Sequence, residues 1–172
     1  MSESALIVEV PEAEAYVAPL RQRFDPTAAL GVPAHVTVLS PFMDVSAATA
    51  EVVSRVEQVL RRTRRFAFDL KHAVPWPTVA YLAAHPREAF NTMTRAIAAE
   101  FPDYQPYGGA HADLVPHLTF AAGDSRTLAL ANDEISSMLV RLGPLRSACA
   151  EVTWIENSTG MWKPFRHITL PS

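Results

Sequence analysis

The spacing of apolar residues predicts strands and helices alternating along the whole chain. Short apolar runs and period-two alternation, both typical of strands, occur at 5–10, 35–42, 66–74, 79–83, 117–121, 145–155 and 161–170. Apolar residues at helical spacing predict helices at 11–24, 48–60, 86–101 and 125–142. We expect Pro19 to break or shorten the first helix, and Asp44 or Ser46 to cap the second.

The two halves of the chain repeat one order of elements, on either side of Pro75-Trp76-Pro77. Each half predicts a strand, a helix, a loop, a strand that begins with histidine, a second helix and a further strand. Val32-Pro33-Ala34-His35 in the first half matches Val115-Pro116-His117 in the second, and the two histidines are 82 residues apart. This order indicates a degenerate duplication within a single domain, 1–172, with half-repeats at approximately 1–75 and 76–172. Chance alternation in an ordinary α/β protein is the alternative.

Composition and charge narrow the class of protein. The 172 residues carry 15 Lys plus Arg against 18 Asp plus Glu, and 49% are hydrophobic, so the chain can bury a core of its own. Cys149 is the single cysteine, which excludes a disulfide scaffold and a cysteine-rich zinc cluster. The net charge of −3 argues against long nucleic acid, including long DNA, as a partner. An acidic amino terminus and the lack of an apolar stretch of membrane-spanning length predict a cytoplasmic protein with no membrane partner.

Three of the six histidines stand in His-x-Thr tripeptides with an aliphatic middle residue. They are His35-Val36-Thr37, His117-Leu118-Thr119 and His167-Ile168-Thr169. Residues i and i+2 of a strand share a face, so each histidine and its threonine should point to one side while the aliphatic residue enters the core. Two such strands side by side would gather two imidazoles and two hydroxyls around one point.

This group of side chains suits a phosphodiester. One imidazole can accept a proton while the other protonates the leaving oxygen, because the pKa of histidine lies near neutrality. Threonine hydroxyls can donate hydrogen bonds to the non-bridging phosphate oxygens. This chemistry needs no metal, and His72, His85 and His111 lack the spacing of metal ligands. The alternative for the paired motifs is a structural role in the strands. We favour that role over a cleft-lining one for His167, which lies outside the duplicated order.

The paired motifs, one in each half of a duplicated chain of this size, resemble the two-histidine (2H) phosphoesterase superfamily, which includes 2′-5′ RNA ligase-like proteins and cyclic nucleotide phosphodiesterases. The resemblance implies a bilobal α+β fold, in which two pseudo-symmetric antiparallel sheets flanked by helices enclose a central cleft. It also implies that His35 and His117 share acid and base duty while Thr37 and Thr119 hold the phosphate. Some members carry a basic residue shortly after a motif, whereas Leu39-Ser40-Pro41 and Ala121-Ala122-Gly123 follow the motifs here.

The motifs predict a metal-independent phosphodiesterase, and the resemblance implies that it acts on 2′,3′-cyclic or 2′-5′-linked nucleotides or RNA ends; ligation of such ends stays open. We expect a monomer without a cofactor. Candidate substrate contacts are Phe42, Tyr81 and Tyr107, since aromatic rings can stack on a base, although Phe42 and Tyr81 could equally be core residues. The alternatives are a cyclic phosphodiesterase for a non-RNA metabolite and a non-catalytic nucleotide- or RNA-binding module of the same fold. The basic cluster at 61–65 is either a solvated helix end or an RNA contact.

Overall fold

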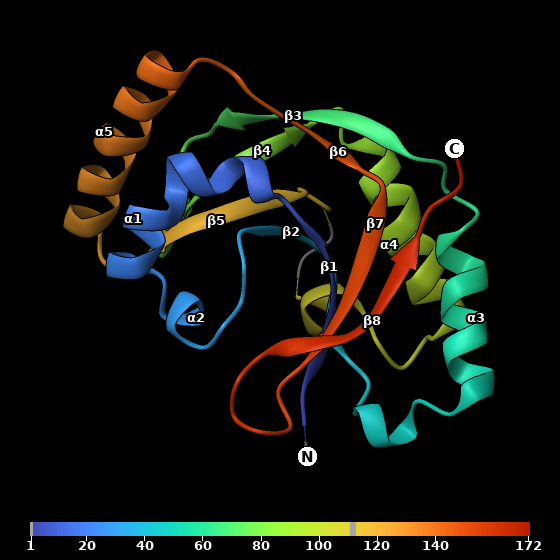
Figure 1. Cartoon of the computed structure of the whole chain (residues 1–172). Coiled ribbons are helices and arrows are strands. Elements are labelled where there is room, and N and C mark those ends of the chain that lie inside the picture. The colour runs from blue at the N-terminus through green and yellow to red at the C-terminus, as the bar shows by residue number, and fades with distance from the viewer. Residues whose placement is uncertain (1, 111–112) are drawn as a thin grey trace.

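The computed structural model describes residues 2–110 and 113–172 (Figure 1), so His111 lies outside the described residues. The strands are β1 (Ser4–Glu9), β2 (His35–Phe42), β3 (Phe66–His72), β4 (Val79–His85), β5 (His117–Ala122), β6 (Leu145–Cys149), β7 (Glu151–Glu156) and β8 (Lys163–Thr169). The α-helices are α1 (Glu14–Phe24), α2 (Pro26–Ala29), α3 (Ala50–Leu60), α4 (Glu88–Glu100) and α5 (Ser125–Leu142). Short 3-10 turns occupy Pro11–Ala13, Val45–Ala47 and Pro106–Gly109. Each helix expected from the apolar spacing forms.

The strands make two antiparallel sheets of four strands each within the described part of the chain. The first sheet has the order β2-β1-β7-β8 and the second the order β5-β4-β3-β6. Helix α4 packs against β2, and helices α1 and α5 pack against β5, so helices flank both sheets (Figure 1). The predicted α+β fold with paired antiparallel sheets is confirmed.

Each sheet contains strands from both halves of the chain. In the first sheet β1 pairs with β2 and also with β7 from the second half, where Leu6 lies opposite Trp154. In the second sheet β4 pairs with β5 and also with β3 from the first half, where Asp69 lies opposite His85. The last strand of the first half, β3, therefore lies in the second sheet, and the last two strands of the second half, β7 and β8, lie in the first. The boundary near residue 75 marks the repeat in chain order, and strands from both sides of it make up each sheet.

The two motif strands share a burial pattern. Val36 and Val38 on β2, and Leu118 and Phe120 on β5, are at most 2% exposed and belong to the main core. The histidines and threonines between them are half-buried. The expected alternation is confirmed, and it turns the polar residues of both motifs away from the core.

Two expectations about helix ends and breaks are wrong. Pro19 lies inside an unbroken α1. Proline lacks the N–H that would bond to the carbonyl of Ala15, but both residues are exposed, so water can hydrate that carbonyl. The cap of α3 is Thr49, because Asp44 instead caps the preceding 3-10 turn by accepting from the N–H of Ser46.

The predicted strand at 145–155 is also wrong, because it is two strands, β6 and β7, which belong to different sheets. Ala150 separates them, and the chain crosses from the second sheet to the first at this point. Cys149 and Val152 are both fully buried although they stand three residues apart. That spacing breaks the period of two and marks the change of sheet. None of the helices in the described residues is long and apolar enough to cross a membrane.

Candidate active site

The rings of His35 and His117 are anchored in the same way at the starts of β2 and β5. Nδ1 of His35 lies 2.7 Å from the carbonyl oxygen of Pro33, and Nδ1 of His117 lies 2.6 Å from that of Val115. A carbonyl oxygen can only accept, so Nδ1 of each ring carries the proton. In the neutral ring Nε2 is then the basic nitrogen, which is the form that a general base needs.

The surroundings of His35 favour its neutral form. Burial lowers the pKa of His35 from 6.5 to about 4, against the opposing effect of its hydrogen bond to the Pro33 carbonyl. Arg21 also lowers this pKa, Asp25 raises it, and the charge of His117 lowers it. Strands β2 and β5, which begin with His35 and His117, are in contact. At neutral pH the ring of His35 is therefore neutral.

The two motif threonines line adjoining hollows. Thr37 lines a small pocket, and Thr119 lines a wider hollow of about 770 Å³ together with His117. Tyr107 and Val115 border both hollows, and the side chain of His35 lines neither. The wider hollow beside the second motif is large enough for a nucleotide-sized ligand, since ligand pockets typically measure about 300–1,000 Å³.

Aromatic rings surround His117. The rings of Trp76 and Tyr81 lie edge-on to it at 4.8 and 5.4 Å, and their own centroids are 4.2 Å apart. The ring of Tyr107 stacks on His117 at 6.1 Å. Trp76 and Tyr107 are 37% and 38% exposed, whereas Tyr81 is 8% exposed. Two of the three aromatic residues expected near substrate therefore lie beside the second motif, and Trp76 joins them.

Phe42 lies in the core, which was the alternative to a substrate contact. Its ring is 4% exposed and contacts the rings of Phe101, Tyr104 and Trp154 at 5.6, 5.2 and 5.1 Å. Packing on several sides leaves it no face on which a base could stack. Phe42 is a core residue at the end of β2.

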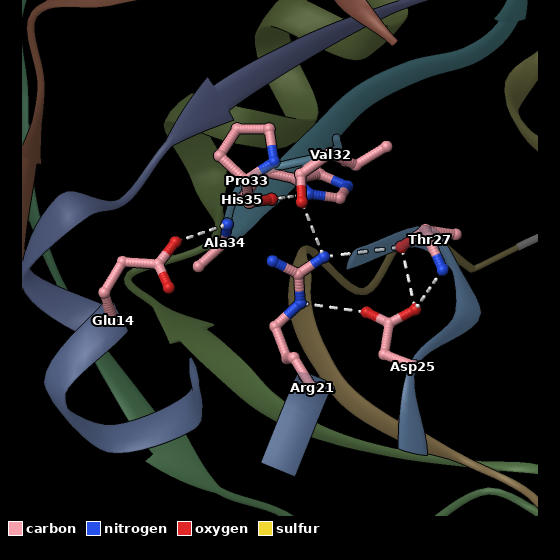
Figure 2. A network of polar contacts seen from close by, with 8 residues as sticks. All are labelled: Glu14, Arg21, Asp25, Thr27, Val32, Pro33, Ala34 and His35. Atoms are coloured by element: carbon pink, nitrogen blue, oxygen red, sulfur yellow. Dashed lines mark hydrogen bonds and ion pairs between the residues drawn. The ribbon is translucent and has the colours of Figure 1, made fainter. Parts of the chain in front are cut away.

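A buried ion pair lies next to the first motif (Figure 2). Arg21 on α1 is 3% exposed and donates from Nε to Asp25 at 2.9 Å. Its Nη2 donates to the carbonyl of Val32 at 2.9 Å and to the hydroxyl of Thr27 at 3.4 Å. One guanidinium thus joins α1, the start of α2 and the segment that leads into β2.

The three residues before His35 are each held by a hydrogen bond. The carboxylate of Glu14 accepts from the N–H of Ala34 at 2.9 Å. Arg21 binds the carbonyl of Val32, and the His35 ring binds that of residue 33. Figure 2 shows Glu14 and Arg21 reaching the segment from two sides. The backbone that carries the first imidazole is therefore fixed residue by residue.

Two side chains on helix α4 bind backbone carbonyls close to both motifs. Asn91 donates to the carbonyl of Leu114, before β5, at 3.2 Å, and Thr94 donates to the carbonyl of Val38, on β2, at 2.7 Å. Both side chains are buried, at 8% and 7% exposure. One helix thereby ties the two motif strands together.

His167 lies on the far edge of the first sheet from His35. The pairing registers place Thr37, Ile7, Thr153 and His167 in one row across the four strands, on one face of the sheet. Three strand spacings put His167 roughly 14 Å from Thr37. Its ring is exposed and bonds to Glu151 at 2.9 Å. The third tripeptide therefore lies across the full width of the first sheet from the first motif.

Among the described residues, no group of three His, Cys, Asp or Glu side chains is arranged to hold a metal ion.

The basic cluster at 61–65 partly holds the last residues of the chain, since Arg61 and Arg65 donate to the carbonyls of Thr169 and Leu170.

Comparison with known proteins places this architecture in a family. The family model of the 2′-5′ RNA ligase superfamily matches residues 9–160. The chain belongs to this superfamily. The resemblance of its sequence to 2H phosphoesterases is thereby confirmed, although no curated protein matches the sequence.

Solved structures share the fold of this 2′-5′ RNA ligase superfamily member. Escherichia coli LigT complexed with 3′-AMP is similar with a TM-score of 0.62, at 16% identity over 99% of both chains. A phosphoesterase has a TM-score of 0.59 at 18% identity over 100% of both chains. TT0787 of Thermus thermophilus has a TM-score of 0.57 at 15% identity, over 98% of this chain and 97% of that one. LigT has also been crystallised with NADP+ and with ATP.

Sequence reasoning missed the polar residues that support the motifs, because these lie on helices far from them in the sequence. Arg21 and Asp25 stand four residues apart, a spacing that allows an ion pair beside the buried Val17 and Leu20. A charged pair on an apolar helix face was the available signal. The sequence places Trp76 only in a Pro-rich break, and no local pattern links it to His117.

Proposed function

We propose that the protein is a phosphodiesterase that needs no metal ion and cleaves 2′,3′-cyclic or 2′-5′-linked nucleotides or RNA ends. The observation that carries the proposal is the pair of identically anchored imidazoles on two contacting strands, each followed two residues later by a threonine. Membership of the 2′-5′ RNA ligase superfamily supports it. The complexes of LigT with 3′-AMP, NADP+ and ATP support a nucleotide-like substrate.

The lowered pKa of His35 supports its role as the base. With a 2′,3′-cyclic nucleotide, Nε2 of His35 takes a proton from water as the water oxygen bonds to phosphorus. One P–O bond to the ribose breaks, and protonated His117 gives its proton to the ribose oxygen that leaves. Thr37 and Thr119 donate to the non-bridging oxygens, whose negative charge grows in the transition state. Proton exchange with solvent then restores both rings.

The aromatic group beside His117 supports a substrate that carries a base. Trp76 and Tyr107 offer partly exposed rings next to the wider hollow, and a base stacked on an aromatic side chain gains about 1–3 kcal/mol. The net charge of −3 supports a small substrate over a long RNA strand. A nucleotide or a short RNA end meets both conditions.

The test is hydrolysis of 2′,3′-cyclic AMP by the purified protein in excess EDTA, followed by phosphorus NMR, which separates the cyclic diester from its monoester products. We expect turnover that EDTA leaves unchanged. Activity lost in EDTA and restored by a divalent metal would contradict the mechanism. Equal turnover of a base-free cyclic phosphate would favour a non-RNA metabolite, and nucleotide binding without turnover would favour a binding module.

A further inference from the structure

We propose that Arg21, with its buried partner Asp25, is a positioning residue for His35; the inference rests on the catalytic role proposed for His35. Arg21 acts through the backbone. Its Nη2 binds the carbonyl of Val32, three residues before His35, and the His35 ring is anchored on the next carbonyl along, that of Pro33. Movement at Val32 would therefore shift the carbonyl that orients the ring.

The second half of the chain repeats this relation with different residues. Asn91 binds the carbonyl of Leu114, which is also three residues before a motif histidine. The ring of His117 is anchored on the next carbonyl, that of Val115. In both halves a buried side chain holds the peptide before the one that orients the imidazole. The recurrence in both halves, with a different supporting side chain in each, argues that this support belongs to the site.

The chemistry of arginine explains why the first half uses an ion pair. Nε and Nη2 of Arg21 reach three acceptors, on Asp25, Thr27 and Val32. A lysine has one ammonium and cannot span them together. A buried ion pair is weak evidence for stability, because desolvation offsets much of the attraction between the charges. Only the planar guanidinium of arginine can bind Asp25 and Thr27 and also hold the Val32 carbonyl in place.

The two charges of the pair also act on His35 in opposite directions. Arg21 lowers the pKa of His35 while Asp25 raises it. The charged and titratable groups that face the ring or its segment are Glu9 opposite it on β1, Glu14 and Arg21 on α1, Asp25 before α2 and His117 on β5. A paired guanidinium can therefore fix the segment without placing an uncompensated positive charge beside a base.

The experiment compares Arg21→Lys with Arg23→Lys. Arg23 lies on the same helix, but its guanidinium is exposed and pairs with Glu134 at 2.8 Å. Arg21→Lys keeps the positive charge that Asp25 needs, so the variant is expected to fold. Two quantities are measured in each protein: kcat and KM for 2′,3′-cyclic AMP, and the protonation state of the His35 ring nitrogens by NMR of 15N-histidine-labelled protein. His35→Gln identifies the His35 signals.

We expect Arg21→Lys to lower kcat about tenfold or more with KM changed less than twofold, and to disturb the Nδ1–H state of His35. Arg23→Lys should leave both unchanged. Wild-type kcat and a wild-type His35 spectrum in Arg21→Lys would overturn the inference, as would a fall in kcat with the spectrum unaltered. If the wild type cleaves no phosphodiester, the proposed function fails, but the NMR spectrum still tests the positioning role of Arg21. A His35 signal altered in Arg21→Lys and unaltered in Arg23→Lys supports that role. A His35 signal unaltered in Arg21→Lys refutes it.

Discussion

Replacing His35 by glutamine should flatten the dependence of stability on pH. Burial lowers the pKa of His35 in the folded protein to about 4, against an ordinary 6.5 in the unfolded chain. Between these values the unfolded ring binds a proton that the folded ring does not. Acid therefore favours the unfolded state. The stability associated with the neutral ring is complete above pH 6.5 and is lost progressively as the pH falls towards 4.

The two pKa values of His35 set the size of the effect. At pH 5 the unfolded ring is almost fully protonated while the folded ring is mostly neutral, which corresponds to a loss of about 2 kcal/mol relative to pH 8. Glutamine cannot titrate, and its amide can still donate to the Pro33 carbonyl. The variant therefore lacks this one contribution.

Urea unfolding followed by tryptophan fluorescence measures the free energy of unfolding of both proteins at pH 8, 7, 6 and 5. The quantity of interest is the difference between wild type and His35→Gln, because the other titrating groups cancel in it. That difference should change by about 2 kcal/mol in favour of the variant between pH 8 and pH 5. A difference that stays constant within about 0.5 kcal/mol would refute the argument that the ring is held neutral by desolvation.

Three further predictions concern catalysis. His35→Ala and His117→Ala should each lower kcat by about 10²–10⁴, whereas His167→Ala should retain wild-type kcat. If His167→Ala loses as much kcat as His35→Ala while His117→Ala stays fully active, His167 replaces His117 in the catalytic pair. The acid limb of kcat/KM should fall near pH 4, since His35 must be neutral to act as a base, and a limb near pH 6.5 measured over the same range would argue against this assignment. Trp76→Ala should raise KM for 2′,3′-cyclic AMP by roughly tenfold while Trp76→Phe changes it little, and equal KM values in the two variants would rule out stacking on this ring.

The elements and the candidate residues could be predicted from the sequence because the signals are local. Two valines stand two residues apart on β2, and β5 carries an equivalent apolar pair. These pairs show which face of each strand is buried, and the polar residues between them must lie on the opposite face. Proline and glycine mark the helix ends in the same local way, as Gly143 does after α5.

The remainder could not be predicted, because it depends on contacts between distant segments. Nothing near Val32 indicates that a side chain eleven residues earlier binds its carbonyl. The exchange of strands between sheets is likewise a property of pairing, which a single apolar run at 145–155 conceals. Phe42 shows the same limit, since an aromatic residue at a strand end fits a core and a binding site equally well until its neighbours are known.

The crossing of β7 into the first sheet has a consequence for synthesis on the ribosome. Strand β1 gains its second neighbour only when β7 has emerged, since Leu6 pairs with Trp154, 148 residues further along. Until then the paired strands β1 and β2 present, along β1, an open edge of backbone N–H and C=O groups to any other extended chain. Contacts so distant in sequence also make folding slow. The nascent chain should therefore be the form most prone to aggregation and the form on which chaperones act.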